Sequence, residues 1–373
     1  MSDSEQGRRR RARRNRRWLA GATGLGAVGA VAGASVARSM THRVAVDDPY
    51  TAEDFALLEA DRGCVVTTPD GVDLVVREVG PVDAPVTVLF AHGFCMNMGA
   101  FHFQRRELSL MWGDQVRMVF YDQRGHGRSG GAAPETYTVE QLGQDLELVL
   151  ATMAPKGSVV LIGHSMGGMT VLSHARQFPS RYGGHIVGVA LISSAAEGLS
   201  RSPLGEILQN PALEAARFAA RYAPGLVHRG RGAVRWVLAP VLQAASFGDE
   251  HVSPTVAKYS EEMIHDTPVS TMVGFLHALG VHDETAALPV LAKLPMLIAC
   301  GSDDVLTTPE HSEEMAAVLP KAELLIIGGA GHLVQLEQPD PIDDALVRLV
   351  DRSTPSKLVA LTRRLKERAR NRG

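Results

Sequence analysis

The sequence feature with the clearest chemical meaning is a serine between two glycines. Residues 163–167 read Gly-His-Ser-Met-Gly; they follow the apolar run 158–162 and precede a stretch with helical spacing. A serine on such a tight strand-to-helix turn projects its hydroxyl above the sheet, and a β-carbon at either flanking glycine would crowd the turn. The helix that begins there directs its positive end toward the same point. The pattern therefore predicts that Ser165 is a nucleophile.

A nucleophilic serine imposes a requirement on the rest of the chain. Its hydroxyl is weakly nucleophilic until an imidazole removes the proton, and the imidazole needs an anion that holds its tautomer. We therefore expect a histidine and a carboxylate from the ends of other strands on the same edge of a sheet.

The elements that must position these groups follow a simple order. From about residue 64 the pattern is strand, turn, strand, and then alternating strands and helices, which predicts a largely parallel sheet. The runs 65–67 and 72–76 flank a Pro-Asp-Gly turn and predict an opening hairpin. Further buried strands are expected at 86–91, 117–121, 159–162, 187–192, 296–300 and 323–327, and helices near 100–112, 137–153 and 166–178.

A long insertion interrupts this alternation. About a hundred residues separate the strand that ends near residue 192 from the next strand, far too many for a plain connection. They contain helical stretches rich in Ala, Leu and Arg, broken by prolines. We expect a helical cap at 197–290, between core segments 60–196 and 291–352, with its side chains selecting the substrate.

Composition and charge narrow the function classes. Hydrophobic residues make up 45% of the chain, which predicts a globular body. Residues 1–17 carry eight arginines and residues 352–373 carry eight Lys or Arg, although the net charge of the whole chain is −3. The body between these ends is therefore acidic, which argues against a nucleic-acid partner because such proteins present a basic face.

Two features that could suggest a metal or cofactor have simpler interpretations. Cys64, Cys95 and Cys300 have neither zinc-site nor disulfide-framework spacing, and we expect them to be buried small hydrophobes, with Cys95 beside the pocket. The glycines in 121–129 lack the Lys-Ser/Thr of a phosphate-binding loop, and no acidic or histidine cluster completes a metal site. We interpret 121–129 as a structural loop and expect neither metal nor organic cofactor.

Three motifs together resemble the α/β-hydrolase fold family. They are GHSMGG at 163–168, AHGF at 91–94 and YDQRGHGRS at 121–129, and the resemblance covers about residues 60–350. It implies a mostly parallel eight-stranded sheet flanked by helices, with an inserted helical cap. It also implies the order nucleophile, acid, histidine along the chain.

The resemblance assigns the two remaining members of a triad. The family's acid lies in a loop of the form G-x-x-D followed by an apolar residue and a threonine or proline, which in residues 301–307 selects Asp304; Asp303 is the rival. The family's general base follows the last strand, which points to His332. Most of the other histidines are better explained as surface or cap residues.

A tetrahedral intermediate also needs two N–H donors aimed at its oxygen. We expect the backbone N–H groups of Met166, which follows the nucleophile, and Phe94, in the loop after the strand at 86–91, to form this oxyanion hole. Met96 and Met98 are predicted to line the substrate pocket with Phe94 and Met166, although such residues are equally compatible with plain core. His92 is expected to be structural.

These residues predict a serine hydrolase that cleaves a small-molecule carboxylic ester, of a lipid or another acyl group, through an acyl-enzyme. Amidases, thioesterases, carbon–carbon bond hydrolases, acyltransferases and cofactor-free haloperoxidases or perhydrolases share the triad, which does not separate them. Epoxide hydrolases and haloalkane dehalogenases are disfavoured, because their relatives carry an aspartate in place of Ser165. A non-catalytic scaffold is disfavoured because all three triad residues are present. The oligomeric state stays open.

The N-terminal region suggests a location. Residues 18–37 are twenty uncharged residues between Arg17 and Arg38, long enough to cross a bilayer, and they are preceded by the basic tail 1–17. We expect a membrane anchor or an export signal, a linker at 38–59, and a catalytic body outside the cytoplasm. A cytoplasmic protein with a fortuitous Gly/Ala run is the alternative. The basic tail 353–373 could add contact with anionic lipids.

Overall fold

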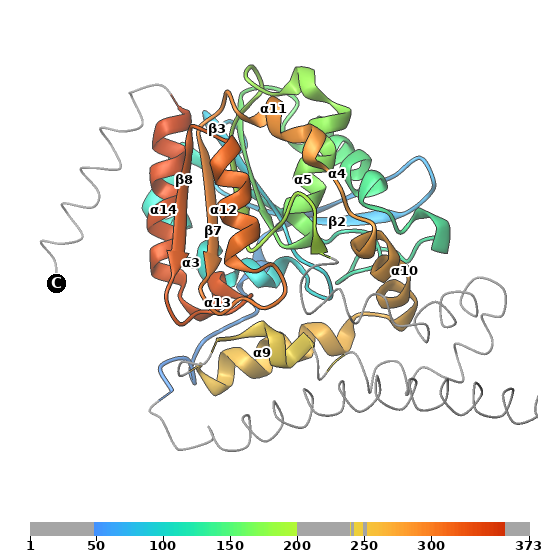
Figure 1. The fold of residues 1–373 in the computed structure, drawn as a ribbon, viewed down its shortest axis with the longest axis vertical. Helices are drawn as coiled ribbons and strands as arrows, with labels where there is room; N and C mark the ends of the chain where they lie inside the picture. The colour runs from blue at the N-terminus through green and yellow to red at the C-terminus, as the bar shows by residue number, and fades with distance from the viewer. Residues whose placement is uncertain (1–47, 200–238, 240–241, 249–251, 355–373) are drawn as a thin grey trace, which may run out of the picture.

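The computed structural model of the chain describes residues 48–199, 239, 242–248 and 252–354. Its middle layer is an eight-stranded sheet with the order β1-β2-β4-β3-β5-β6-β7-β8 (Figure 1). β1 and β2 form an antiparallel hairpin and β2 is antiparallel to β4, whereas every other neighbouring pair is parallel. The strands are β1 (Arg62–Thr67), β2 (Asp73–Val79), β3 (Val86–Ala91), β4 (Val116–Tyr121), β5 (Ser158–His164), β6 (Ile186–Ile192), β7 (Met296–Gly301) and β8 (Ala322–Ile327).

The parallel strands are the ones predicted from continuous apolar runs, and burial explains why. Every residue of β3, β4 and β7 is buried, because helices cover both faces of the sheet. A strand buried on both faces has no polar alternation, so the sequence shows an unbroken hydrophobic segment. The predicted strand positions, including the opening hairpin, are confirmed to within a few residues. The expectation that the strand at 323–327 is buried was wrong, because β8 is the last strand of the sheet and only its final residue, Ile327, is buried.

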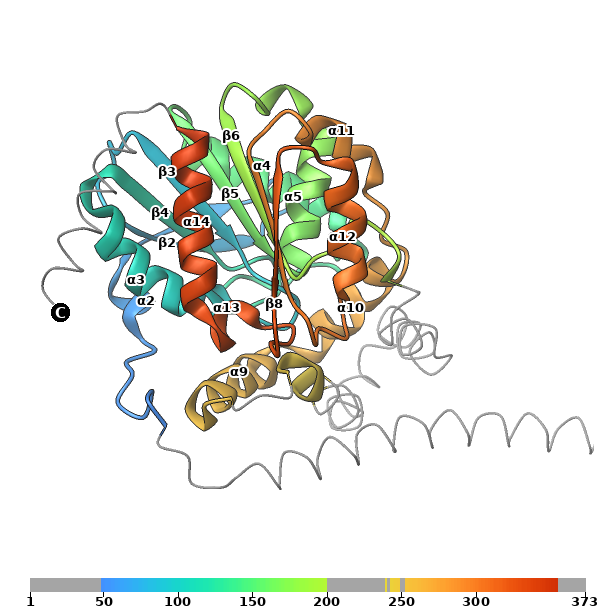
Figure 2. The same ribbon diagram turned by 60° about the vertical axis from the view of Figure 1, so that its left-hand side comes forward.

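Helices pack on both faces of the sheet (Figures 1 and 2). The two sides of β5 show the division: Val160 and Ile162 belong to the apolar cluster shared with α3 and α14, and Val159 and Leu161 to the cluster shared with α4 and α5. One layer contains α2 (Leu57–Ala60), α3 (His102–Trp112), α13 (Val334–Glu337) and α14 (Pro339–Ser353), and the other contains α4 (Val139–Met153), α5 (Met166–Gln177), α11 (Leu288–Leu291) and α12 (Pro309–Val318). Short 3₁₀ turns lie at Met98–Phe101, Gly113–Gln115, Pro134–Thr136, Pro179–Arg181 and Thr285–Ala287.

Two further helices lie between β6 and β7 in sequence and cross the carboxyl ends of the parallel strands (Figure 2). They are α9 (Pro254–Asp266), capped by the Ser253 hydroxyl, and α10 (Val269–Gly280). Met263 of α9 and Met272 of α10 share an apolar cluster with residues of the loops that follow β3 and β8. Residues 200–238 of the predicted cap lie outside the described residues, so its boundaries, and those of the core segments, stay predictions.

The predicted membrane or signal segment, 18–37, also lies outside the described residues, as do the tail 1–17 and residues 355–373. Among the helices of the described ranges, none combines the length and the apolar composition needed to cross a bilayer.

One cysteine departs from its predicted environment. Cys95 and Cys300 are buried, but Cys64 is exposed. The prediction was wrong because Cys64 lies on β1 at the edge of the sheet, where five of the six strand residues are exposed.

Candidate active site

The predicted nucleophile lies at the turn between β5 and α5. Ser165 has φ 52° and ψ −120°, a backbone conformation that non-glycine residues rarely adopt. A β-carbon at Gly163 would overlap the carbonyl of Gly167, and a β-carbon at Gly167 would overlap the carbonyl of Ala91. Both glycines are therefore required for close backbone contact, and the strained turn holds the serine at the carboxyl edge of the sheet.

His332 and Asp304 meet Ser165 at this edge. His332 follows β8 and Asp304 follows β7, so three strand ends supply the three side chains. The Ser165 Oγ atom is 2.9 Å from His332 Nε2, and His332 Nδ1 is 2.9 Å from Asp304 Oδ2. Because a carboxylate only accepts, His332 donates through Nδ1, which leaves Nε2 free to accept the serine proton.

Asp304 is buried but surrounded by donors. It accepts hydrogen bonds from the backbone N–H groups of Leu306 and Thr307, both at 2.9 Å, and from the Thr307 hydroxyl at 2.8 Å. Burial, the largest single influence, raises the pKa of Asp304, but His332 and the Thr307 donors outweigh it, so the pKa lies below its ordinary value. The neighbouring carboxylate of Asp303 instead accepts from the Ser302 hydroxyl at 2.7 Å.

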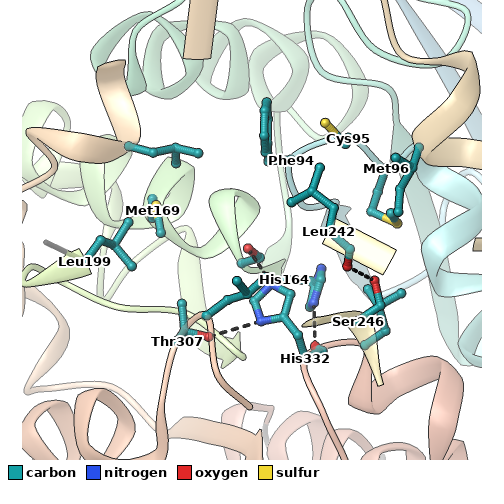
Figure 3. A pocket seen from close by; sticks show the side chains of 15 residues that line it. Phe94, Cys95, Met96, His164, Met169, Leu199, Leu242, Ser246, Thr307 and His332 are labelled. Carbon is teal, nitrogen blue, oxygen red and sulfur yellow. Dashed lines mark hydrogen bonds between the residues drawn. The ribbon is translucent and has the colours of Figure 1, made fainter. Parts of the chain in front are cut away.

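A second histidine supports the first. His164, within the serine turn, lies with Nε2 at 3.0 Å from the backbone carbonyl of His332, to which it donates (Figure 3). Burial lowers the pKa of His164 to about 3, so its ring is neutral. His92 is likewise buried, and burial holds its pKa well below the ordinary value; its Nε2 accepts from the Gln123 N–H at 2.9 Å, which gives it a structural role.

The predicted oxyanion residues flank the serine. Met166 follows it as the first residue of α5. The loop after β3 passes close to the serine: a β-carbon at Gly93 would lie only 3.1 Å from Ser165 Cβ. Phe94 is the next residue of this loop. The two backbone segments expected to provide donors are thus adjacent to the nucleophile.

Residues 121–129 hold the loop after β3 in place. His126 Nε2 accepts from the Cys95 N–H at 3.2 Å, and Asp122 Oδ1 accepts from the Met98 N–H at 2.8 Å. The segment is therefore a structural support beside the site, as the sequence predicted.

A mostly apolar pocket opens onto Ser165 and His332 (Figure 3). Phe94 and Met96 are among its lining residues, as is Cys95. Within the described ranges, no group of three His, Cys, Asp or Glu side chains is placed to bind a metal ion. Among the residues that the structure describes, the lining comprises Phe94, Cys95, Met96, His164, Ser165, Met169, Leu199, Leu242, Ser246, Ile264, Leu279, Leu306, Thr307, His332 and Leu333.

The side chains of two predicted pocket residues lie elsewhere. Met98 begins a 3₁₀ turn and packs in the core cluster that contains Phe90 and Phe101, so its predicted pocket role is corrected. The Met166 side chain packs in the cluster around Phe275 and is fully buried. Met169, one helical turn later, lines the pocket instead.

Sequence reasoning also missed several other residues. Two of them could have been found from their spacing. Met169 lies three residues after Met166 on the same helix, and Thr307 lies three residues after Asp304 in the acid loop. Leu242, Ile264 and Leu279 come from the inserted region, where no local signal marks a pocket residue.

Comparison with known proteins agrees with this geometry. Residues 88–345 match the model of the alpha/beta hydrolase family. The chain belongs to this family. A proline iminopeptidase from Pestalotiopsis fici is 25% identical over 279 residues, covering 73% of this chain and 93% of the relative. A 3-oxoadipate enol-lactonase from Acinetobacter baylyi is 28% identical, covering 74% and 92%.

The fold of this alpha/beta hydrolase is shared with solved structures. A thermophilic esterase from Thermogutta terrifontis superposes with a TM-score of 0.61 at 24% identity, over 79% of this chain and all of the esterase. The predicted fold class and the prediction of a hydrolase-type enzyme are confirmed.

Proposed function

We propose that this alpha/beta hydrolase cleaves carboxylic esters, with Ser165 as nucleophile, His332 as general base and acid, and Asp304 as the anion that orients His332. The observation that supports this most strongly is the unbroken hydrogen-bond chain from Ser165 Oγ through both ring nitrogens of His332 to Asp304. Such a chain activates a serine hydroxyl and stabilises the imidazolium that forms.

The first half of the reaction acylates the serine. Ser165 Oγ attacks the ester carbonyl carbon while His332 Nε2 takes its proton, and the carbonyl oxygen becomes an oxyanion. The backbone N–H groups of Phe94 and Met166 donate to this oxyanion. When the tetrahedral intermediate collapses, the C–O bond to the leaving group breaks, and His332 returns the proton to the departing alcohol.

The second half releases the acid. His332 Nε2 takes a proton from a water molecule, whose oxygen attacks the acyl carbon. Collapse of this second intermediate breaks the bond to Ser165 Oγ, and the proton on His332 returns to the serine. The carboxylic acid leaves and the free enzyme is restored.

The pocket lining supports an uncharged, apolar acyl group as substrate. Met169, Leu279 and Ile264 contribute apolar side chains beside the nucleophile. The lactonase relative acts, by its name, on an enol-lactone, and a lactone is a cyclic ester. An ester is therefore a chemically consistent substrate for this chain.

The experiment that tests the proposal is hydrolysis of p-nitrophenyl esters of increasing acyl length, alongside a prolyl anilide, a thioester and a peracid-forming assay. We expect hydrolysis of esters that falls once the acyl chain exceeds the pocket, with Ser165→Ala as inactive control. Turnover of the anilide or thioester without any ester hydrolysis would overturn the ester assignment.

We propose separately that residues 18–37 enter a membrane, as an anchor or an export signal, and that the catalytic body lies outside the cytoplasm. The support is the charge bias of residues 1–17 beside a twenty-residue uncharged run. Fractionation of cells with protease added to spheroplasts tests this. A full-length protein that stays protected in the cytoplasmic fraction would refute it.

A further inference from the structure

A segment of the inserted region lies directly against the loop that carries His332. The Leu333 N–H donates to the carbonyl of Ser246 at 2.7 Å. A β-carbon at Gly331 would overlap the backbone of Phe247, and one at Gly248 would overlap the carbonyl of Gly329. Residues 242–248 and 329–333 are therefore in backbone-to-backbone contact, with no side chain between them.

One carboxylate joins these two segments. Glu337, the last residue of α13, accepts from the Gly331 N–H through Oε2 at 2.8 Å. Its two oxygens also lie 3.1 and 3.2 Å from the Gly248 N–H. Gly331 immediately precedes His332, so the same charged group binds the inserted segment and the residue next to the general base. Hydrogen bonds to an ionised acceptor are stronger than neutral ones.

The opposite side of the histidine loop is fixed by the acid loop. The carbonyl of Ala330 accepts from the Asp303 N–H at 2.9 Å, and a β-carbon at Gly301 would overlap that carbonyl. The loop is thus held between two layers, the acid loop of the core and residues 242–248. Loss of the second layer removes one of the supports of the His332 loop.

We propose that Glu337 is a positioning residue for His332 and that it couples the placement of segment 242–248 to the placement of the general base. The inference rests on the proposed function. Leu242 and Ser246 of the same segment line the pocket, so one segment forms part of the pocket wall and also contacts the loop that carries the general base. Glu337 acts on the chemical step through geometry and makes no contact with the ester.

The test compares Glu337→Ala and Glu337→Gln in the full-length protein. Alanine removes the hydrogen bonds to Gly248 and Gly331, whereas the glutamine amide keeps one oxygen acceptor and presents a donor to the other N–H. With an acetyl ester we expect kcat of Glu337→Ala to fall about 100-fold, because a misplacement of about 1 Å has that effect. KM should change less than about twofold, and Glu337→Gln should lie between Glu337→Ala and the wild type.

The fall in kcat at a nearly constant KM separates this from a merely structural role, and amide exchange checks the geometry behind it. Amide hydrogen exchange at Gly248 and Gly331 should accelerate together in Glu337→Ala. The matched control Glu313→Gln removes an exposed carboxylate of α12 and should change neither exchange nor kcat. Thermal unfolding of each variant shows whether it folds. If Glu337→Ala does not fold, the kinetics of Glu337→Gln are used for the test.

A folded Glu337→Ala with wild-type kcat would overturn the inference, and so would a raised KM with unchanged kcat, which would assign Glu337 to substrate binding alone. A wild-type protein that hydrolyses no ester refutes the proposed function instead. The two failures are distinguishable because the wild type is assayed first with the same acetyl ester.

Discussion

Two buried carboxylates show how differently the same group behaves in two parts of this molecule. Asp304, at the active site, and Asp343, on α14, are each 2% exposed. Asp304 accepts from two backbone N–H groups, the Thr307 hydroxyl and His332. Asp343 accepts from the side-chain amide of Gln104 at 2.9 Å, and its Oδ2 has no hydrogen-bond partner.

The difference in donors reverses the effect of burial. Burial raises the pKa of Asp343 to about 7, because the single Gln104 donor offsets little of the penalty. At Asp304 the same penalty is outweighed by His332 and the loop donors, and the pKa is lowered. A perturbed carboxyl is therefore not enough to mark a catalytic site. The informative feature is a buried carboxylate kept ionised beside a histidine.

The largest expected loss of kcat comes from removing the nucleophile or the general base that Asp304 orients. Ser165→Ala and His332→Ala should each lower kcat on an ester substrate by several orders of magnitude, up to about 10⁶-fold, because each residue takes part in bond making. Folding should be largely retained, as judged by circular dichroism. A Ser165→Ala protein with more than a tenth of the wild-type activity would be incompatible with the mechanism.

The next effect tests the carboxylate itself. Asp304→Asn should lower kcat by about 10⁴-fold, because an amide at this position favours the wrong imidazole tautomer. Asp303→Asn is the matched control and should cost far less, since that carboxylate accepts from Ser302 rather than His332. Steady-state kinetics of both variants decide, and a reversed ranking would transfer the role to Asp303.

A smaller loss of kcat is expected when one hydrogen-bond donor to Asp304 is removed. Thr307→Val removes the hydroxyl that donates to Asp304 at 2.8 Å but leaves the backbone donors in place. We expect kcat to fall about tenfold, the equivalent of one hydrogen bond to a charged group. Thr307→Ser, which restores the hydroxyl, should recover most of the activity. Thr307→Val with wild-type activity, or a loss confined to Thr307→Ser, would mean that the threonine methyl group, not its hydroxyl, is what matters.

The smallest effect on catalysis is expected from substitution of Asp343, the buried carboxylate on α14. The folded-state pKa of Asp343, about 7, lies above its ordinary value of 3.8, so the folded state binds the extra proton between these values. This contribution to stability is present at low pH and is lost as pH rises toward 7. Asp343→Asn keeps an acceptor for Gln104 and does not titrate. It should therefore gain stability relative to the wild type, by a few kcal/mol, between pH 5 and pH 8.

Urea unfolding of both proteins at pH 5 and pH 8 measures this difference, and ester hydrolysis should be unchanged by the substitution. Parallel stability of wild type and variant at both pH values would show that Asp343 is ionised in the folded protein.

Much of the core could be predicted from sequence because its signals are local. The buried strands are continuous apolar runs, and the turn at Ser165 needs glycines on both sides for a steric reason that the structure bears out. Cys64 was misplaced because an apolar run does not reveal whether its strand lies at the edge of the sheet.

The pocket could be predicted only in part, because its lining depends on side-chain direction and distant contacts. Met98 and Met169 are equally apolar, but a 3₁₀ turn directs Met98 into the core. Leu242 and Leu279 reach the site from the inserted region. Glu337 binds a backbone N–H that is 89 residues away in the chain, and no periodicity or motif spacing reports such a contact.

The role of Ser165 as nucleophile is tested most directly by the site of covalent labelling with a fluorophosphonate. The reagent phosphonylates an activated serine, and trypsin then releases residues 157–176, which contain Ser165. We predict a single adduct, assigned to Ser165 by fragmentation, that is absent from Ser165→Ala and forms slowly in His332→Ala and Asp304→Asn. An active enzyme that carries no adduct, or carries it on a different residue, would contradict the central claim that Ser165 is the nucleophile.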